Sequence, residues 1–264
     1  MRLGWIFGLM VLLSVRLKAQ TPLPRAHAHN DYEHPRPLWD ALDQGFCGVE
    51  ADIWLVEGAL LVAHDRKDVR TGRTLEALYL APLRERARNK GGRIFPGVAE
   101  FTLLIDLKQD AAATYDVLGP LLERYRDVLT RFTDTNATPG AVTVILSGSR
   151  PIEPVKAAPE RWCAIDGRLP DLESNPSPFL MPLVSDSWRP TFGWFTDGGM
   201  PAADRTRLED LVRRAHQQGR RIRFWGLQDQ EYVWRELDLA GVDLINTDKL
   251  VELRKFLESR KSQP

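Results

Sequence analysis

Eight short runs rich in β-forming residues recur along the chain, and amphipathic helical stretches separate most of them. This alternation predicts an α/β protein with a parallel sheet, because a strand reaches a parallel neighbour through a crossover connection. Eight strands also close a (β/α)8 barrel, so we expect a single TIM barrel. The predicted strands are residues 25–29, 49–55, 103–108, 142–146, 162–165, 179–184, 221–227 and 243–246.

Four stretches between these runs have helical character, namely residues 37–45, 112–132, 203–219 and 230–241. Three of them end at a glycine (Gly45, Gly219 and Gly241), the usual residue at which a helix stops before the next strand. The sequence has no internal repeat and no linker long enough to divide it. We therefore predict one domain, residues 20–264.

The first 19 residues have the pattern of a secretory signal peptide, with a cationic start at Arg2 and an apolar run from Trp5 to Val15. A retained membrane anchor is the alternative, but this run is 11 residues long, whereas a bilayer span takes about 20. We expect cleavage after Ala19 and a secreted or periplasmic protein.

Removal of residues 1–19 leaves 245 residues, with 33 basic against 36 acidic side chains and so a net charge of −3. This length is close to the roughly 250 residues typical of one such barrel. The absence of a basic excess argues against a nucleic-acid partner. Cys47 and Cys163 lie far apart in apolar surroundings, and we predict two buried thiols rather than a disulfide framework.

Two carboxylates, Glu50 and Asp52, lie two residues apart in the strand "GVEADIWL". Residues at this spacing share one face of a strand, and in a barrel that face is the interior. Unpaired buried carboxylates are costly, and a cation between them removes the cost. Asp106 and Lys108 repeat the spacing in "LLIDLK", so three oxygen ligands are available for a hard divalent ion such as Ca2+ or Mg2+. An edge strand with a solvated polar face is the alternative.

After Leu55 the chain returns as "LLVAHD" over too short an interval for a helix, which predicts an antiparallel hairpin at the barrel mouth. A two-residue turn at Glu57 and Gly58 would place His64 opposite Ala51. A three-residue turn would place it opposite Asp52. We predict the second register, because it brings an imidazole beside the carboxylates.

Three of the five histidines lie in "RAHAHNDYEH", residues 25–34. His27 and His29 alternate on the first predicted strand, so both can face the interior at the end of the barrel where such folds carry their active sites. One of them and His64 would flank the metal as general acid and base. His34 is interpreted as a loop residue, and His216 as a surface histidine on a helix.

The motifs "AHAHND", "VEADIWL", "VAHD" and "LIDLK", with the C-terminal run "IRFWGLQDQEYVWRELDLAGVDLINTD", resemble the superfamily of phosphatidylinositol-specific phospholipases C and glycerophosphodiester phosphodiesterases. The branch that the chain resembles most carries HxHNDY and includes altered-inheritance-of-mitochondria phosphodiesterase-like proteins. The His-Arg-Gly and Pro-Glu-Asn-Thr motifs of the phosphodiesterases proper are missing, which leaves the phosphate-binding arginine unassigned.

The resemblance implies a phosphoric diester hydrolase of the same TIM-barrel type, acting on a glycerophosphodiester or a phospholipid head group, with peripheral membrane contact. A hydroxyl of the substrate would attack the phosphorus, one histidine taking its proton and another protonating the leaving alkoxide. The implied residues are Glu50, Asp52 and Asp106 as ligands of Ca2+ or Mg2+, His27 or His29 with His64 as the acid–base pair, Lys108 beside the phosphate, and Asn30 against the substrate. Trp225 either lines the pocket wall against the substrate or is a core tryptophan.

Two other functions are weighed against this one. His-x-His on a first barrel strand also begins metal-dependent amidohydrolases, but the predicted strands at 142–146, 162–165 and 179–184 contain no histidine or lysine for zinc. A barrel that binds a phosphate or lipid head group without turnover is the second. The aromatic residues Trp188, Phe192, Trp194 and Phe195 either form a lipid-facing lip or pack over the barrel end.

Overall fold

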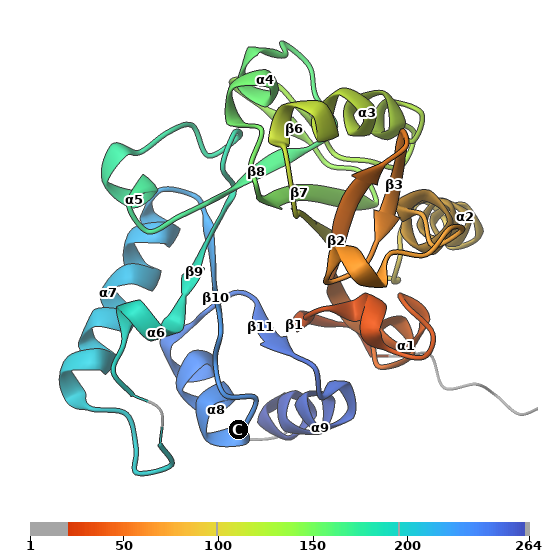
Figure 1. The fold of residues 1–264 in the computed structure, drawn as a ribbon. Coiled ribbons are helices and arrows are strands. Elements are labelled where there is room, and N and C mark those ends of the chain that lie inside the picture. The colour runs from red at the N-terminus through yellow and green to blue at the C-terminus, as the bar shows by residue number, and fades with distance from the viewer. Residues whose placement is uncertain (1–20, 99, 195, 262–264) are drawn as a thin grey trace, which may run out of the picture.

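The computed structural model describes residues 21–98, 100–194 and 196–261, and in them eight parallel strands form a nearly closed barrel with helices around its outside (Figure 1). The predicted TIM barrel is confirmed, and each predicted strand overlaps one that is observed. The barrel strands are β1 (Leu23–Ala28), β2 (Phe46–Val56), β4 (Phe101–Leu107), β7 (Val142–Gly148), β8 (Ala164–Gly167), β9 (Leu183–Ser187), β10 (Arg221–Trp225) and β11 (Ile245–Thr247).

The strands follow the order β10, β9, β8, β7, β4, β2, β1, β11, and one bridge between Arg223 and Leu244 brings the path back to β10. The pairing of β4 with β7 is continuous from Phe101 to Leu107, whereas the register of β1 on β2 shifts between Leu23 and His27. The barrel is therefore firmly paired around β4 and joined by a single bridge between β10 and β11.

The helices lie between successive strands, and the predicted helices at residues 37–45, 203–219 and 230–241 are all present. Gly45, Gly219 and Gly241 have φ of 81°, 71° and 80°, the left-handed conformation that lets glycine end a helix. The helices are α1 (Trp39–Asp43), α2 (Ala81–Asn89), α3 (Ala111–Glu123), α4 (Ile152–Ala157), α5 (Asp171–Ser174), α6 (Trp188–Thr191), α7 (Ala202–Gln217), α8 (Glu231–Ala240) and α9 (Leu250–Lys261). Asp31–Glu33 and Arg66–Asp68 form short 3-10 helices, and Glu76–Leu80 is a π-helical segment before α2.

The predicted helix over residues 112–132 is wrong in its second half, because α3 ends at Glu123 and Arg131–Phe132 form the short strand β5 beside β6 (Ala137–Thr138). Phe132 exchanges backbone hydrogen bonds with Arg161, and its ring packs inside the barrel. The need to close the barrel interior with an aromatic ring thus overrides the local helical pattern.

The barrel interior has an apolar layer and, nearer the carboxyl ends of the strands, a polar one. Leu104, Ile145, Ala164, Leu183 and Leu244 form the apolar layer together with Phe132. Two residues further along the strands, the polar layer contains His27, Asp52, Asp106, Ser147, Asp166, Arg223 and Asn246. Because inward positions recur every second residue, the same strands carry both layers.

Most of the aromatic segment after β9 packs into the core. Trp188, Phe192 and Trp194 are buried, and the rings of Trp188 and Phe192 contact Phe224 edge to face. These three residues therefore belong to the hydrophobic core and do not form an exposed lip. Phe195 lies outside the described residues. The two cysteines are buried and form no disulfide, as predicted. Within the described ranges no helix is long and apolar enough to cross a bilayer, and the predicted signal segment, residues 1–19, lies outside them.

Candidate active site

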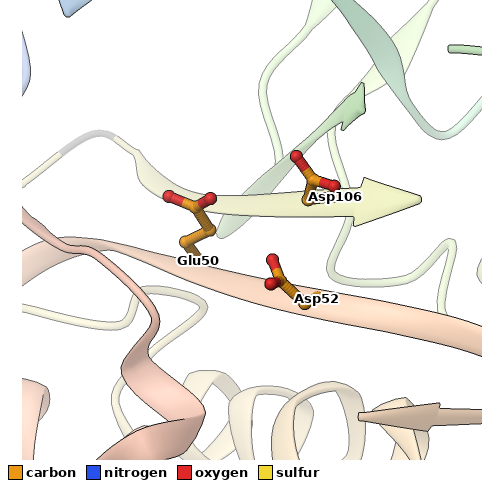
Figure 2. Close-up of side chains that lie close together, drawn as sticks. All are labelled: Glu50, Asp52 and Asp106. Atoms are coloured by element: carbon orange, nitrogen blue, oxygen red, sulfur yellow. The ribbon is translucent and has the colours of Figure 1, made fainter. Parts of the chain in front are cut away.

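Three carboxylates from two neighbouring strands meet at the carboxyl end of the barrel. Asp52 of β2 and Asp106 of β4 are direct register partners, and Glu50 lies two residues earlier on β2. One oxygen from each of the three lies within 4.8 Å of the others, and Figure 2 shows the carboxylates gathered between the two strands. The predicted convergence of Glu50, Asp52 and Asp106 is confirmed.

The surroundings of these carboxylates fit a hard divalent cation. Asp52 is fully buried, and its Oδ1 has no hydrogen-bond partner among the residues that the structure describes. Gly148 leaves room for Asp106, since a Cβ there would lie 2.4 Å from Asp106 Oδ1. A donor set made only of carboxylate oxygens suits Mg2+ or Ca2+ and is unlike a zinc site.

Two cationic side chains pair with the three carboxylates. Lys108 Nζ lies 2.8 Å from Asp52 Oδ2 and 3.3 Å from Asp106 Oδ1. Arg223 on β10, 2% exposed, donates through Nη2 to Glu50 Oε2 and through Nε to Asn246 Oδ1 at 2.7 Å. Although burial opposes it, the Arg223 guanidinium holds the pKa of Glu50 well below its usual range. Burial and the neighbouring Glu50 raise the pKa of Asp52 to about 6.

His64 reaches Asp52, although the hairpin register differs from the predicted one. β2 and β3 (Ala59–Val62) pair through a two-residue turn, with Val56 opposite Ala59, which makes the three-residue prediction wrong. Glu57 and Gly58 both have positive φ, 49° and 77°, the conformation of a tight hairpin turn. Beyond Val62 the chain leaves the strand, and His64 Nδ1 lies 3.1 Å from Asp52 Oδ2.

Tyr32 belongs to this site and was missed in the sequence. Its hydroxyl donates to Asp52 Oδ2 at 2.5 Å and lies 2.9 Å from Asn30 Oδ1 and 3.2 Å from His64 Nδ1. Burial and the Asp52 charge raise the pKa of Tyr32, so the hydroxyl remains a donor. Asn30, predicted to bind substrate, therefore lies beside Tyr32. The available signal was the phenol in "HNDY", three residues after a predicted catalytic histidine.

Buried Asp31 holds the turn that carries Asn30 and Tyr32. Asp31 Oδ2 accepts hydrogen bonds from the Leu38 backbone N–H at 2.5 Å and from the Tyr79 hydroxyl at 2.8 Å. Asp31 thus stabilises the loop, whereas Tyr32 contacts the Asp52 carboxylate.

The two histidines of β1 and its end occupy different environments. His27 is fully buried, its Nε2 lies 3.7 Å from Glu50 Oε2, and burial lowers its pKa to about 4. His29 follows the last residue of β1, and its Nδ1 lies 2.9 Å from Asp248 Oδ1. It lines a small pocket of about 90 Å³ together with Asn246. The His29 side chain is therefore partly exposed at the barrel mouth, whereas that of His27 is enclosed.

Asp248 was not assigned a role in the sequence, although it ends the "INTD" run. Burial opposes protonation of His29, but the hydrogen bond to Asp248 raises the pKa of the imidazole above its ordinary value. The same contact orients the ring, because it fixes which nitrogen faces the carboxylate.

The remaining predicted residues lie where the strand pattern implies. Trp225 ends β10 and is 39% exposed, so it is a rim residue and not part of the core. His216 pairs with Asp243 at 2.9 Å on the outer helix α7, and His34 lies in the loop after β1. Neither of these two histidines joins the carboxylate cluster.

Across the barrel mouth, β7, β8 and β9 carry a second polar cluster without histidine. Buried Asp166 accepts hydrogen bonds from Ser147 Oγ at 2.7 Å, from Arg168 Nη1 at 2.8 Å and from Ser185 Oγ. Burial raises the pKa of Asp166. These strands provide no imidazole or lysine, so the amidohydrolase arrangement has no support here.

Comparison with known proteins identifies the family of the chain. An AIM6-like phosphodiesterase domain matches residues 17–163. The altered inheritance of mitochondria protein 6 homologue of Arthroderma benhamiae is 28% identical, over 86% of this chain and 81% of that protein. Altered inheritance of mitochondria protein 6 of Eremothecium gossypii is 32% identical, over 89% of this chain and 69% of its own length.

Solved structures of low sequence identity share the fold. A calcium-dependent phosphoinositol-specific phospholipase C from a Pseudomonas species superposes with a TM-score of 0.59 at 15% identity, covering 87% of this chain and 91% of that one. A glycerophosphodiester phosphodiesterase from Parabacteroides distasonis gives 0.54 at 17% identity, covering 90% and 98%. With the family match over more than half of its length, the chain belongs to the AIM6-like phosphodiesterase family, on the barrel fold of the phospholipases C and glycerophosphodiester phosphodiesterases.

Proposed function

We propose that this protein hydrolyses phosphodiesters with the help of a divalent ion held by Glu50, Asp52 and Asp106. The observation that carries the proposal is the convergence of these carboxylates with Lys108 in contact and with His64 hydrogen-bonded to the same Asp52. His29 lies at the same end of the barrel, against Asp248.

The two imidazoles have the partners that acid–base catalysis needs. Asp248 holds His29 Nδ1, so its Nε2 takes the proton of a substrate hydroxyl as the hydroxyl oxygen bonds to phosphorus. His64, held by Asp52 through Nδ1, gives a proton from Nε2 to the alkoxide as the bond from phosphorus to that oxygen breaks. The products of this step are a cyclic phosphate and an alcohol. Hydrolysis is completed when a water molecule gives a proton to His64 and bonds to phosphorus, while His29 protonates the ring oxygen as its bond to phosphorus breaks.

The charge that develops on the non-bridging phosphoryl oxygens is offset by Lys108 and by the divalent ion, which supplies Lewis-acid polarisation when bound. Lys108 stays protonated for this role, because Asp52 and Asp106 raise its pKa although burial opposes them. Asn30 and Trp225 are the rim residues proposed to contact the rest of the substrate.

We propose a glycerophosphodiester or a phospholipid head group as the substrate, and export through residues 1–19 with cleavage after Ala19. Mass spectrometry of the N-terminus of the mature protein from its native host tests the export. A mature chain that still begins at Met1 would overturn it.

The activity test uses residues 20–264 with a panel of glycerophosphodiesters and phospholipids that carry a hydroxyl beside the phosphate, with and without EDTA. His64→Ala is expected to reduce kcat at least 100-fold, since general acid–base groups contribute about 10²–10⁴. His216→Ala is the matched control, because it removes another histidine that pairs with an aspartate. No turnover with Mg2+, Mn2+ or Ca2+ would favour the non-catalytic binding barrel.

A further inference from the structure

Each of the three proposed metal ligands already has one oxygen engaged by the protein. Glu50 Oε2 accepts from Arg223 Nη2. Asp52 Oδ2 accepts from the Tyr32 hydroxyl at 2.5 Å and lies 2.8 Å from Lys108 Nζ. Asp106 Oδ1 lies 3.3 Å from Lys108 Nζ and faces Gly148. Within the part of the chain that the structure describes, no hydrogen bond or ion pair engages the second oxygen of any of the three, so this oxygen is left for a cation.

Arg223 is the most firmly fixed of these donors. Its side chain is 2% exposed, and Asn246 Oδ1 holds its Nε at 2.7 Å, so the guanidinium cannot swing away from Glu50 without leaving a buried charge unpaired. Glutamate has the longest and most flexible side chain of the three ligands, and it would otherwise be the one most able to offer both oxygens to an ion.

This arrangement favours one class of divalent ion. Three carboxylates that each offer one oxygen leave the remaining positions to water and substrate, which suits the six-coordinate, octahedral shell of Mg2+. Ca2+ takes about six to eight oxygen ligands and commonly binds a carboxylate through both oxygens. We propose that the site selects a small octahedral ion of the Mg2+ class over Ca2+, and that Arg223 is the residue that determines this selectivity.

The inference rests on the metal site of the proposed function, and it specifies the class of ion that this site binds. It also sets the chain apart from the calcium-dependent phospholipase C whose fold it shares. The selectivity is a property of binding, so its test needs no substrate.

The test is isothermal titration of EDTA-stripped protein with MgCl2 and with CaCl2, using the wild-type protein, Arg223→Met, Tyr32→Phe and Arg221→Met. Arg223→Met frees Glu50 Oε2 and is expected to lower the ratio of Kd for Ca2+ to Kd for Mg2+ at least tenfold. Tyr32→Phe relieves one contact to Asp52 Oδ2 and should shift the ratio in the same direction by a smaller factor.

Arg221→Met is the matched control, because Arg221 lies two residues earlier on β10 and binds Glu100 and Thr102 instead. It should leave the ratio unchanged. If Arg223→Met does not fold by circular dichroism, Tyr32→Phe carries the test. Wild-type binding of neither ion would overturn the metal site itself. Tight binding with a ratio that Arg223 and Tyr32 variants leave unmoved would overturn the selectivity while the metal site stands.

Discussion

The two halves of the barrel mouth both bury an aspartate, but they balance its charge differently. On the β7, β8 and β9 side, Asp166 faces one cation, Arg168, and two serine hydroxyls. On the β2 and β4 side, three carboxylates share two cations, Lys108 and Arg223. Asp52 and Asp166 each have one buried oxygen without a hydrogen-bond partner in the described part of the chain.

An unpaired buried oxygen therefore does not by itself distinguish a metal site from a structural cluster. The distinction comes from the surplus of negative charge in a small volume, which is present around Asp52 and missing around Asp166. A buried surplus charge is costly, and a bound cation relieves it.

The difference between the two halves is tested most directly by substitution of their two aspartates. Asp52→Asn is expected to abolish divalent-ion binding and to reduce kcat/KM at least 1000-fold, about 4 kcal/mol of transition-state stabilisation. It replaces one carboxylate oxygen with an amide NH2 and removes the negative charge that Lys108, His64 and the proposed ion share. Activity on a glycerophosphodiester and calorimetric titration with Mg2+ measure the two effects.

Asp166→Asn is the counterpart in the other half. It is expected to lower the free energy of unfolding by about 1–3 kcal/mol, because Arg168 and two serines lose a charged acceptor. Urea titration measures this loss of stability. The folded variant should keep its metal affinity, measured by calorimetric titration without urea. Loss of metal binding in this variant would show that the two halves form one site.

A smaller effect is expected at the rim contact between His29 and Asp248. Because Asp248 raises the pKa of His29, Asp248→Asn should lower that pKa. As His29 must be neutral to accept a proton, the acidic limb of the kcat/KM profile should move to lower pH. The ring proton resonance of His29 should titrate at lower pH in the same variant.

Asp243→Asn, which removes the partner of His216, is the control for this prediction and should leave the profile in place. An acidic limb that does not move with Asp248→Asn would exclude His29 as the general base.

The smallest effect is expected at Trp225, which is exposed at the end of β10. Trp225→Ala should raise KM about two- to tenfold with little change in kcat, since loss of apolar contact with the substrate costs roughly 1 kcal/mol. Trp39→Ala, at another partly exposed tryptophan on α1, should change neither constant. A change in kcat alone at Trp225 would contradict a role in binding.

The carboxylates could be predicted from the sequence because their placement follows from two general rules. Spacing of two puts Glu50 and Asp52 on one face of a strand, and parallel neighbours bring Asp106 to the same barrel end. Both rules act within a strand or between adjacent strands, so no knowledge of the closed barrel is needed.

The contact of Arg223 with Glu50 could not be predicted in the same way. Arg223 reaches Glu50 across 173 positions of sequence, and that contact depends on how the barrel closes. The predicted hairpin register was wrong because it was chosen from the expected position of His64 and not from the turn residues. Glu57 and Gly58, both at positive φ, form the two-residue turn and so set the pairing of the two strands.

The single bridge between β10 and β11 gives the barrel one place where it opens most easily. Local opening there requires breaking fewer backbone hydrogen bonds than along the continuous pairing of β4 with β7, so amide hydrogens at this seam should exchange at a lower free energy than those of β4 and β7. Arg223 spans the seam, since it lies on β10 and binds Asn246 of β11. The Arg223 side chain that binds Glu50 therefore also links β10 to β11. Its removal should lower the free energy of local opening of the barrel.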